Sequence, residues 1–112
     1  MPNQPIPVSD AEQMTTLYIG YMQSLGVSMA TQTHSVSFVA DDLFNWMREM
    51  MPYTDEFRIC MGVYPPGHVH AGRTSAIIWP YWKGEPAVYP EGEAGVGGGG
   101  PINPFNDGGL NP

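Results

Sequence analysis

Two histidines separated by a single residue, His68 and His70, are the side chains whose type and spacing most directly suggest chemistry in this chain. On an extended backbone, residues two apart point to the same side, and imidazoles spaced in this way can bind a transition-metal ion. Such a site needs three or four ligands, so His34 or Asp55 would have to complete it. The other interpretation is that both histidines are exposed residues of a turn, because Pro-Pro-Gly at 65–67 interrupts the preceding strand pattern.

With a glycine six residues before it, this histidine pair resembles the first metal-binding motif of the cupin family, which implies a metal-binding β-barrel. The chain departs from the motif, because Thr74 or Ser75 stands in place of the family's glutamate and Gly95 in place of its last histidine. A largely helical first half also leaves too few strands to close a barrel. Metal binding through His68 and His70, in a metal-binding protein or a metal-dependent enzyme, is therefore kept as an alternative function.

The remaining reactive side chains lack the surroundings that catalysis requires. Cys60 falls within a strand pattern, where we expect a buried, unreactive thiol rather than an activated nucleophile. The adjacent acids Asp41 and Asp42, and likewise Asp55 and Glu56, diverge on a regular backbone, so we expect them to begin a helix and a strand. The sequence thus gives no catalytic residue and requires no cofactor.

Aromatic residues gather near residue 80. Trp79, Tyr81 and Trp82 lie within four residues around Pro80, and such side chains offer a large contact area at a small cost in rotamer entropy. Together with Tyr64 they form a candidate binding surface for a small molecule, a sugar ring or a peptide. In the alternative interpretation, Trp79 closes the core while Tyr81 and Trp82 cover the end of a sheet.

Two helices are predicted in the first half of the chain. The first covers about residues 10–25, because Ser9 and Glu12 fit a capping box and Gly26 provides a stop. The second begins at two adjacent acids, which favour a helix N-terminus, and ends at Pro52. Their apolar faces are predicted to be Met14, Leu17, Tyr18, Tyr21 and Leu25 in the first, and Leu43, Trp46, Met47 and Met50 in the second.

Alternating residues predict strands at 34–39, at 55–64 and from 73 to about 80, with a further short strand at 87–89. The second and third form an antiparallel hairpin around a loop of about eight residues. Alternate residues of the second strand point to one face of the sheet, and these are Phe57, Ile59, Met61 and Val63.

The expected fold class is therefore α+β: a small, mainly antiparallel sheet of three to four strands with both helices packed on one face. The opposite face, with Cys60, Tyr64, Ile77 and Trp79, would then present an apolar patch to solvent. A patch of this kind in a small protein usually indicates self-association or a ligand groove.

Composition divides the chain into a Pro-rich lead at residues 1–8, a single α+β domain at 9–90 and a tail at 91–112. The tail holds 8 Gly and 3 Pro in 22 residues, with three acids and no basic residue. Ordering the backbone costs about 1–2 kcal/mol of conformational entropy per residue, and burial of the few apolar side chains of the tail does not offset this cost. We therefore predict a flexible, acidic tail.

The net charge is −7, with only four basic residues, and these are scattered along the chain. A nucleic-acid partner and an anionic membrane surface are therefore not expected. The single cysteine and the absence of a basic, apolar leader favour a soluble, cytoplasmic protein.

The order of a polar strand, an acid-started helix, a strand of the type RICMGVY and a strand of the type GRTSAIIWPY resembles a loose group of small uncharacterised bacterial α+β proteins with no assigned function. The resemblance covers about residues 35–89 and implies the fold only. The favoured function is a non-enzymatic interaction module that associates with copies of itself or with another protein.

Overall fold

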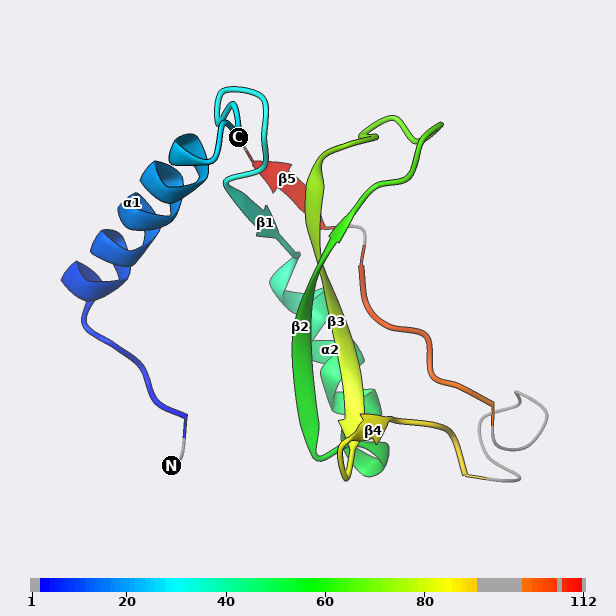
Figure 1. The fold of residues 1–112 in the computed structure, drawn as a ribbon. Coiled ribbons are helices and arrows are strands. Elements are labelled where there is room, and N and C mark those ends of the chain that lie inside the picture. The colour runs from blue at the N-terminus through cyan, green and yellow to red at the C-terminus, as the bar shows by residue number, and fades with distance from the viewer. Residues whose placement is uncertain (1–2, 91–99, 107, 112) are drawn as a thin grey trace.

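The protein was analysed as a computed structural model that describes residues 3–90, 100–106 and 108–111. Two helices and a small antiparallel sheet confirm the α+β class (Figure 1). In chain order the elements are α1 (Val8–Ser24), β1 (Ser35–Ser37), α2 (Ala40–Met50), the 3-10 helix η1 (Met51–Tyr53), β2 (Glu56–Val63), β3 (Thr74–Trp82), β4 (Glu85–Pro86) and β5 (Gly109–Asn111).

The centre of the fold is the antiparallel hairpin of β2 and β3, whose register runs from Glu56 opposite Tyr81 to Val63 opposite Thr74. β3 continues through Pro80 to Trp82, two residues beyond the predicted end. A proline lacks a backbone N–H, but the Pro80 carbonyl still accepts a hydrogen bond from the Ala87 N–H at 2.8 Å. Pro80 is therefore compatible with a strand that has β2 on one side and Ala87 on the other.

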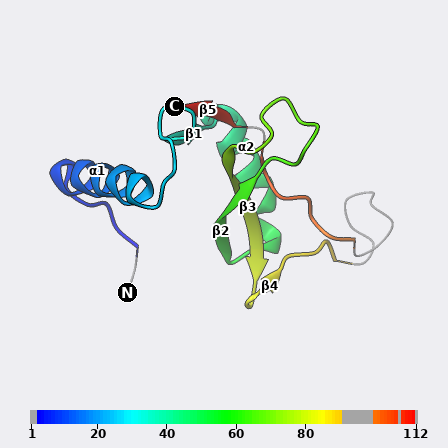
Figure 2. The same cartoon turned by 45° about the horizontal axis from the view of Figure 1, so that its top comes forward.

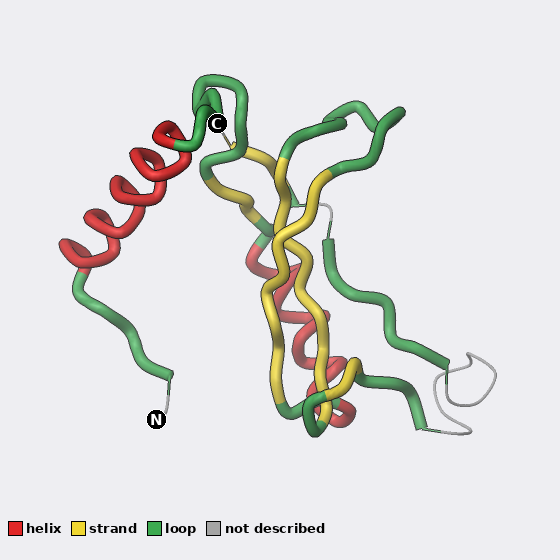
Figure 3. The backbone as a smooth tube through the Cα atoms, in the orientation of Figure 1, coloured by secondary structure: helices red, strands yellow, loops and turns green. Residues whose placement is uncertain are grey.

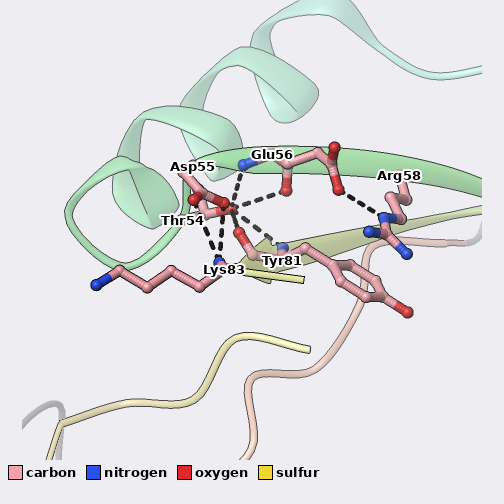
Figure 4. Close-up of polar contacts among 6 residues, drawn as sticks. All are labelled: Thr54, Asp55, Glu56, Arg58, Tyr81 and Lys83. Carbon is pink, nitrogen blue, oxygen red and sulfur yellow. Dashed lines mark hydrogen bonds and ion pairs between the residues drawn. The ribbon is translucent and has the colours of Figure 1, made fainter. Parts of the chain in front are cut away.

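A tight turn joins β3 to β4, and Lys83 and Gly84 both have positive φ there, as in a type I′ hairpin. Polar contacts from the start of β2 hold this end of the hairpin (Figure 4). The buried Thr54 hydroxyl donates to the Tyr81 carbonyl at 2.6 Å, and Asp55 accepts from the Lys83 N–H. The acid at the strand start thus has a structural role, as predicted.

Helix α2 covers one face of the hairpin. Its first turn contains Asp41 and Asp42, which suit the positive end of the helix dipole. The Trp46 ring lies 5.6 Å from the Phe57 ring, so α2 packs on the predicted apolar face of β2. The helix ends at Met50, and the chain continues into the 3-10 turn η1, which contains Pro52.

The prediction of a flexible tail is wrong for residues 100–106, whereas residues 91–99, 107 and 112 lie outside the described part of the chain. Ile102 is 4 % exposed and packs in the core with Met50 and Ala87. Phe105 exchanges two backbone hydrogen bonds of 2.9 Å with Ile78, so this segment, drawn as loop in Figure 3, borders β3. Although the segment is rich in Gly, Pro and Asn, Ile102 is part of the core and the Phe105 ring lies 5.0 Å from the Trp46 ring.

The end of the chain also pairs with β1. β5 lies antiparallel to β1, with Val36 opposite Leu110, and the two form a separate two-stranded sheet. Gly108 permits this approach, because a Cβ there would lie 2.8 Å from the Ser37 carbonyl oxygen. The predicted strand at 34–39 therefore exists as Ser35–Ser37, and its partner comes from the segment that we expected to be a tail.

Helix α1 corrects two further expectations. It begins at Val8 with Pro7 as its N-cap residue and no side-chain cap, so the predicted capping box does not form. It ends close to Gly26, as expected, where φ is +86°. None of its residues is buried, and Figures 1 and 2 show it standing away from the hairpin. Of the two helices, α2 alone packs on the sheet.

Candidate functional site

An apolar groove of about 640 Å³ lies between α1 and the rest of the chain. Five elements contribute to it: α1, β1, α2, β2 and β3. Its lining contains no Asp, Glu, Lys or Arg side chain among the described residues. Representative lining residues are Tyr18 and Met22 of α1, Leu43 and Met47 of α2, and Ile59 and Met61 of β2.

The groove exists because α2 is too short to cover the hairpin. Eleven helical residues span about 16 Å, whereas the eight residues of β2 span about 26 Å. Ile78 is buried in β3, but Ile59 and Met61 of the neighbouring strand are each 69 % exposed. The apolar face of β2 thus extends beyond the helix that was expected to hide it.

The connection between α1 and β1 forms one rim of the groove. Met29 and Thr33 are buried, and the Thr33 hydroxyl donates to the Thr74 carbonyl at 2.6 Å. The Thr74 N–H donates to the Gln32 side-chain oxygen at 2.8 Å, and the His34 ring Nε2 donates to the Met29 carbonyl. These contacts fix the connection to the start of β3, so His34 has a structural partner here.

The four aromatic residues of the predicted binding surface do not lie together. Side chains alternate along a strand, so Trp79 and Tyr81 share one face with Tyr64, whereas Trp82 points to the α2 side. On the first face the Arg58 guanidinium lies 4.0 Å from the centre of the Tyr81 ring. The hydrogen bond from Arg58 Nε to Glu56, at 2.6 Å, raises the pKa of Arg58 above its usual value (Figure 4).

The face opposite α2 is less exposed than the sequence suggested. Cys60, Ile77, Trp79 and Tyr64 point away from α2, as predicted, but all four are half-buried. The most exposed apolar side chains of the hairpin strands lie instead on the α2 side. The apolar surface that was expected on one side of the sheet is therefore greatest on the other, beside α1.

Trp82 is 47 % exposed and lines a second, smaller pocket of about 470 Å³. The other walls come from η1, from β4 and from the segment after β4, and they include Pro52, Pro86 and Pro90. The Lys83 ammonium group lies 5.6 Å from the centre of the Trp82 ring. The lining also includes Tyr53 and Glu85, so this pocket has two aromatic side chains, one basic residue and one acid.

The two candidate metal ligands are brought close to each other. The His68 and His70 rings lie 5.7 Å apart between centres, and the Tyr64 ring stacks on His68 at 4.2 Å. The His70 N–H donates to His68 Nδ1 at 3.0 Å, which occupies one ligating nitrogen. His34 lies at the groove rim, and Asp55 lies at the other end of the hairpin. Within the described ranges no three His, Cys, Asp or Glu side chains form a group able to hold a metal ion.

Comparisons of this chain with protein-family models, with curated proteins and with solved structures gave no match. No helix among the described residues is both long enough and apolar enough to cross a membrane. The groove was the feature that sequence reasoning missed. Its signal was present in the apolar stripe of α1 and in the excess of methionine, but a stripe by itself does not show whether it is covered.

Proposed function

We propose that this chain is a non-enzymatic protein-interaction module that self-associates through its apolar groove. The observation that carries the proposal is the exposure of Ile59, Met61 and Val63, which are 64–69 % accessible on consecutive positions of one strand face. Contiguous apolar surface of this kind usually marks an interaction site in a soluble protein. Met47 and Met61 in the lining add adaptable contacts of the sort that occur at binding surfaces.

Further support comes from the charge distribution. The chain carries a net charge of −7, yet the lining of the groove contains no Asp, Glu, Lys or Arg among the described residues. Binding of a partner in the groove therefore does not remove a charged Asp, Glu, Lys or Arg side chain of the lining from water. Such desolvation of a charge would weaken the association. The same charge disfavours nucleic acid as a partner, so we propose a protein partner, in a cytoplasmic setting that suits a single free cysteine.

Light scattering coupled to size exclusion tests the proposal. The expected result is a mass above the 12.3 kDa of one chain, increasing with protein concentration. Met61→Glu should shift the particle to the single-chain mass, because a charge would then be buried in an apolar interface. Val69→Glu is the matched control, since Val69 is 86 % exposed in the loop between β2 and β3. A single-chain mass at every concentration would refute self-association.

The pocket beside Trp82 supports a second candidate, a small-molecule or carbohydrate binder. A half-exposed indole at a pocket wall can stack on a sugar ring, and the pocket volume lies within the range of small-ligand sites. Titration with a glycan panel should change the Trp fluorescence of the native chain but not that of Trp82→Ala. Identical titration curves for the two proteins would exclude this use of the pocket.

A further inference from the structure

Helix α1 carries an apolar stripe that the rest of the described chain leaves exposed. The stripe residues recur at helical spacing and are 39–63 % exposed. Gly20 and the neighbouring threonines are weak helix formers, so this helix depends on packing against another surface for its stability. The stripe consists of Met14, Leu17, Tyr18, Tyr21 and Leu25.

The uncovered face of β2 has the dimensions to receive such a helix. The 17 residues of α1 span about 25 Å, which matches the roughly 26 Å of β2. Between them lies the groove of about 640 Å³, and it is open rather than filled by the chain's own side chains. Two uncovered apolar surfaces of the described chain therefore face the same space.

The connection keeps α1 from closing onto its own hairpin. From Met29 onward it is held by burial and by the hydrogen bonds of Gln32 and Thr33 to Thr74, as described above. The buried Met29 lies five residues after the end of α1 at Ser24, so the anchored segment fixes where the short link to α1 begins. Figures 1 and 2 show the helix leaving this anchored segment and diverging from β2. The described part of the chain therefore supplies no occupant for the groove.

We propose that this occupant is helix α1 of a second copy, and that the exchange is reciprocal. Each copy then inserts its stripe between α1 and β2 of the other, which is the arrangement expected of a two-fold symmetric dimer. This inference rests on the proposed self-association and specifies its geometry. The exchange covers both the α1 stripe and the exposed face of β2 in each chain.

The area available agrees with a dimer. Full burial of one large apolar side chain removes roughly 60–120 Å² from water. With the exposures found here, the five stripe residues and the three exposed residues of β2 offer about 400 Å² of apolar surface per copy. A standard interface buries about 800 Å² per partner, of which slightly more than half is apolar. The stripe and the β2 face together are of the size that a stable dimer needs.

Cross-linking of the full chain tests the exchange. In a Cys60→Ala background, Leu17→Cys places a thiol on the stripe and Met61→Cys places one in the groove. Equal amounts of the two single-thiol proteins are mixed, equilibrated and oxidised, and the triple variant that carries both thiols is oxidised separately. The expected products are a covalent heterodimer joined between residues 17 and 61 in the mixture, and a covalent dimer in the triple variant.

Other outcomes separate the two proposals. A triple variant that closes within one chain would overturn the exchange, because the helix would then cover its own hairpin. A dimer by light scattering that forms no link between residues 17 and 61 would overturn the exchange and leave self-association intact. A single-chain mass would overturn both.

A charge substitution adds a measurement that does not depend on cross-linking. Leu17→Asp should weaken the dimer at least about tenfold, because it removes an apolar contact and buries a carboxylate. Thr16→Asp adds the same charge on the opposite side of α1 and should leave the dissociation constant within about twofold. Equal effects of the two substitutions would show that the stripe is not the contact.

Discussion

Truncation of Ile102 should destabilise the whole domain, although composition alone would place this residue in a flexible tail. Ile102 is 4 % exposed and packs against Met50 and Ala87, in a core with only a handful of fully buried side chains. Ile102→Ala removes about three buried carbons, worth roughly 2.4 kcal/mol by transfer, and leaves a cavity. We therefore expect a loss of about 3 kcal/mol in the free energy of unfolding, out of the roughly 5–15 kcal/mol of a typical domain.

Urea denaturation followed by Trp fluorescence measures this loss. A decrease of about 3 kcal/mol lowers the Tm of a domain of this size by roughly 12–24 °C. The graded variant Ile102→Val should cost about 0.5–1.5 kcal/mol and remain folded at room temperature. Val69→Ala, in an exposed loop, should change stability by less than about 0.5 kcal/mol. If Ile102→Ala behaves like Val69→Ala, the segment at 100–106 is not part of the core and the reasoning is refuted.

Three further contacts are tested by substitution, one of them with a matched control. Gly108→Ala should lower the free energy of unfolding by about 1–3 kcal/mol, because its Cβ would lie 2.8 Å from the Ser37 carbonyl oxygen. The control Gly20→Ala, at a helix position with open space around it, should raise the free energy of unfolding by about 0.5–1 kcal/mol in the same urea titration. Thr54→Val should lower the urea midpoint by an amount equivalent to about 1–3 kcal/mol, since the buried Thr54 hydroxyl donates to the Tyr81 carbonyl and accepts from the Tyr81 N–H. An unchanged midpoint would mean that water replaces the hydroxyl. Arg73→Leu should raise the thermal midpoint, because Nε and Nη2 of Arg73 are buried without a hydrogen-bond partner among the described residues, and a lower midpoint would show that the guanidinium is paired in solution.

Local patterns were sufficient to predict both helices and the strands β1, β2 and β3, but not β4 or β5. The alternation in β2 identified which side chains share a face, and the two acids in the first turn of α2 marked its start. Gly26 marked the end of α1 for a reason that is equally local, namely its positive φ. Such features depend on residues close in sequence, so a sequence alone contains them.

Which elements pair or pack with each other was decided only by the tertiary structure. Ile102 and Phe105 stand among turn-forming residues, and only the edge of β3 and the core beside α2 turn that segment into an ordered part of the fold. Likewise, the apolar stripe of α1 is consistent both with a helix that packs on the sheet and with a helix that stands away from it. The hydrogen bonds that anchor Thr33 and Gln32 to β3 decide between these cases, and they join residues about 40 positions apart. Burial is a property of such distant pairs, so the sequence determined which surfaces are apolar, whereas the tertiary structure decided which of them remain uncovered.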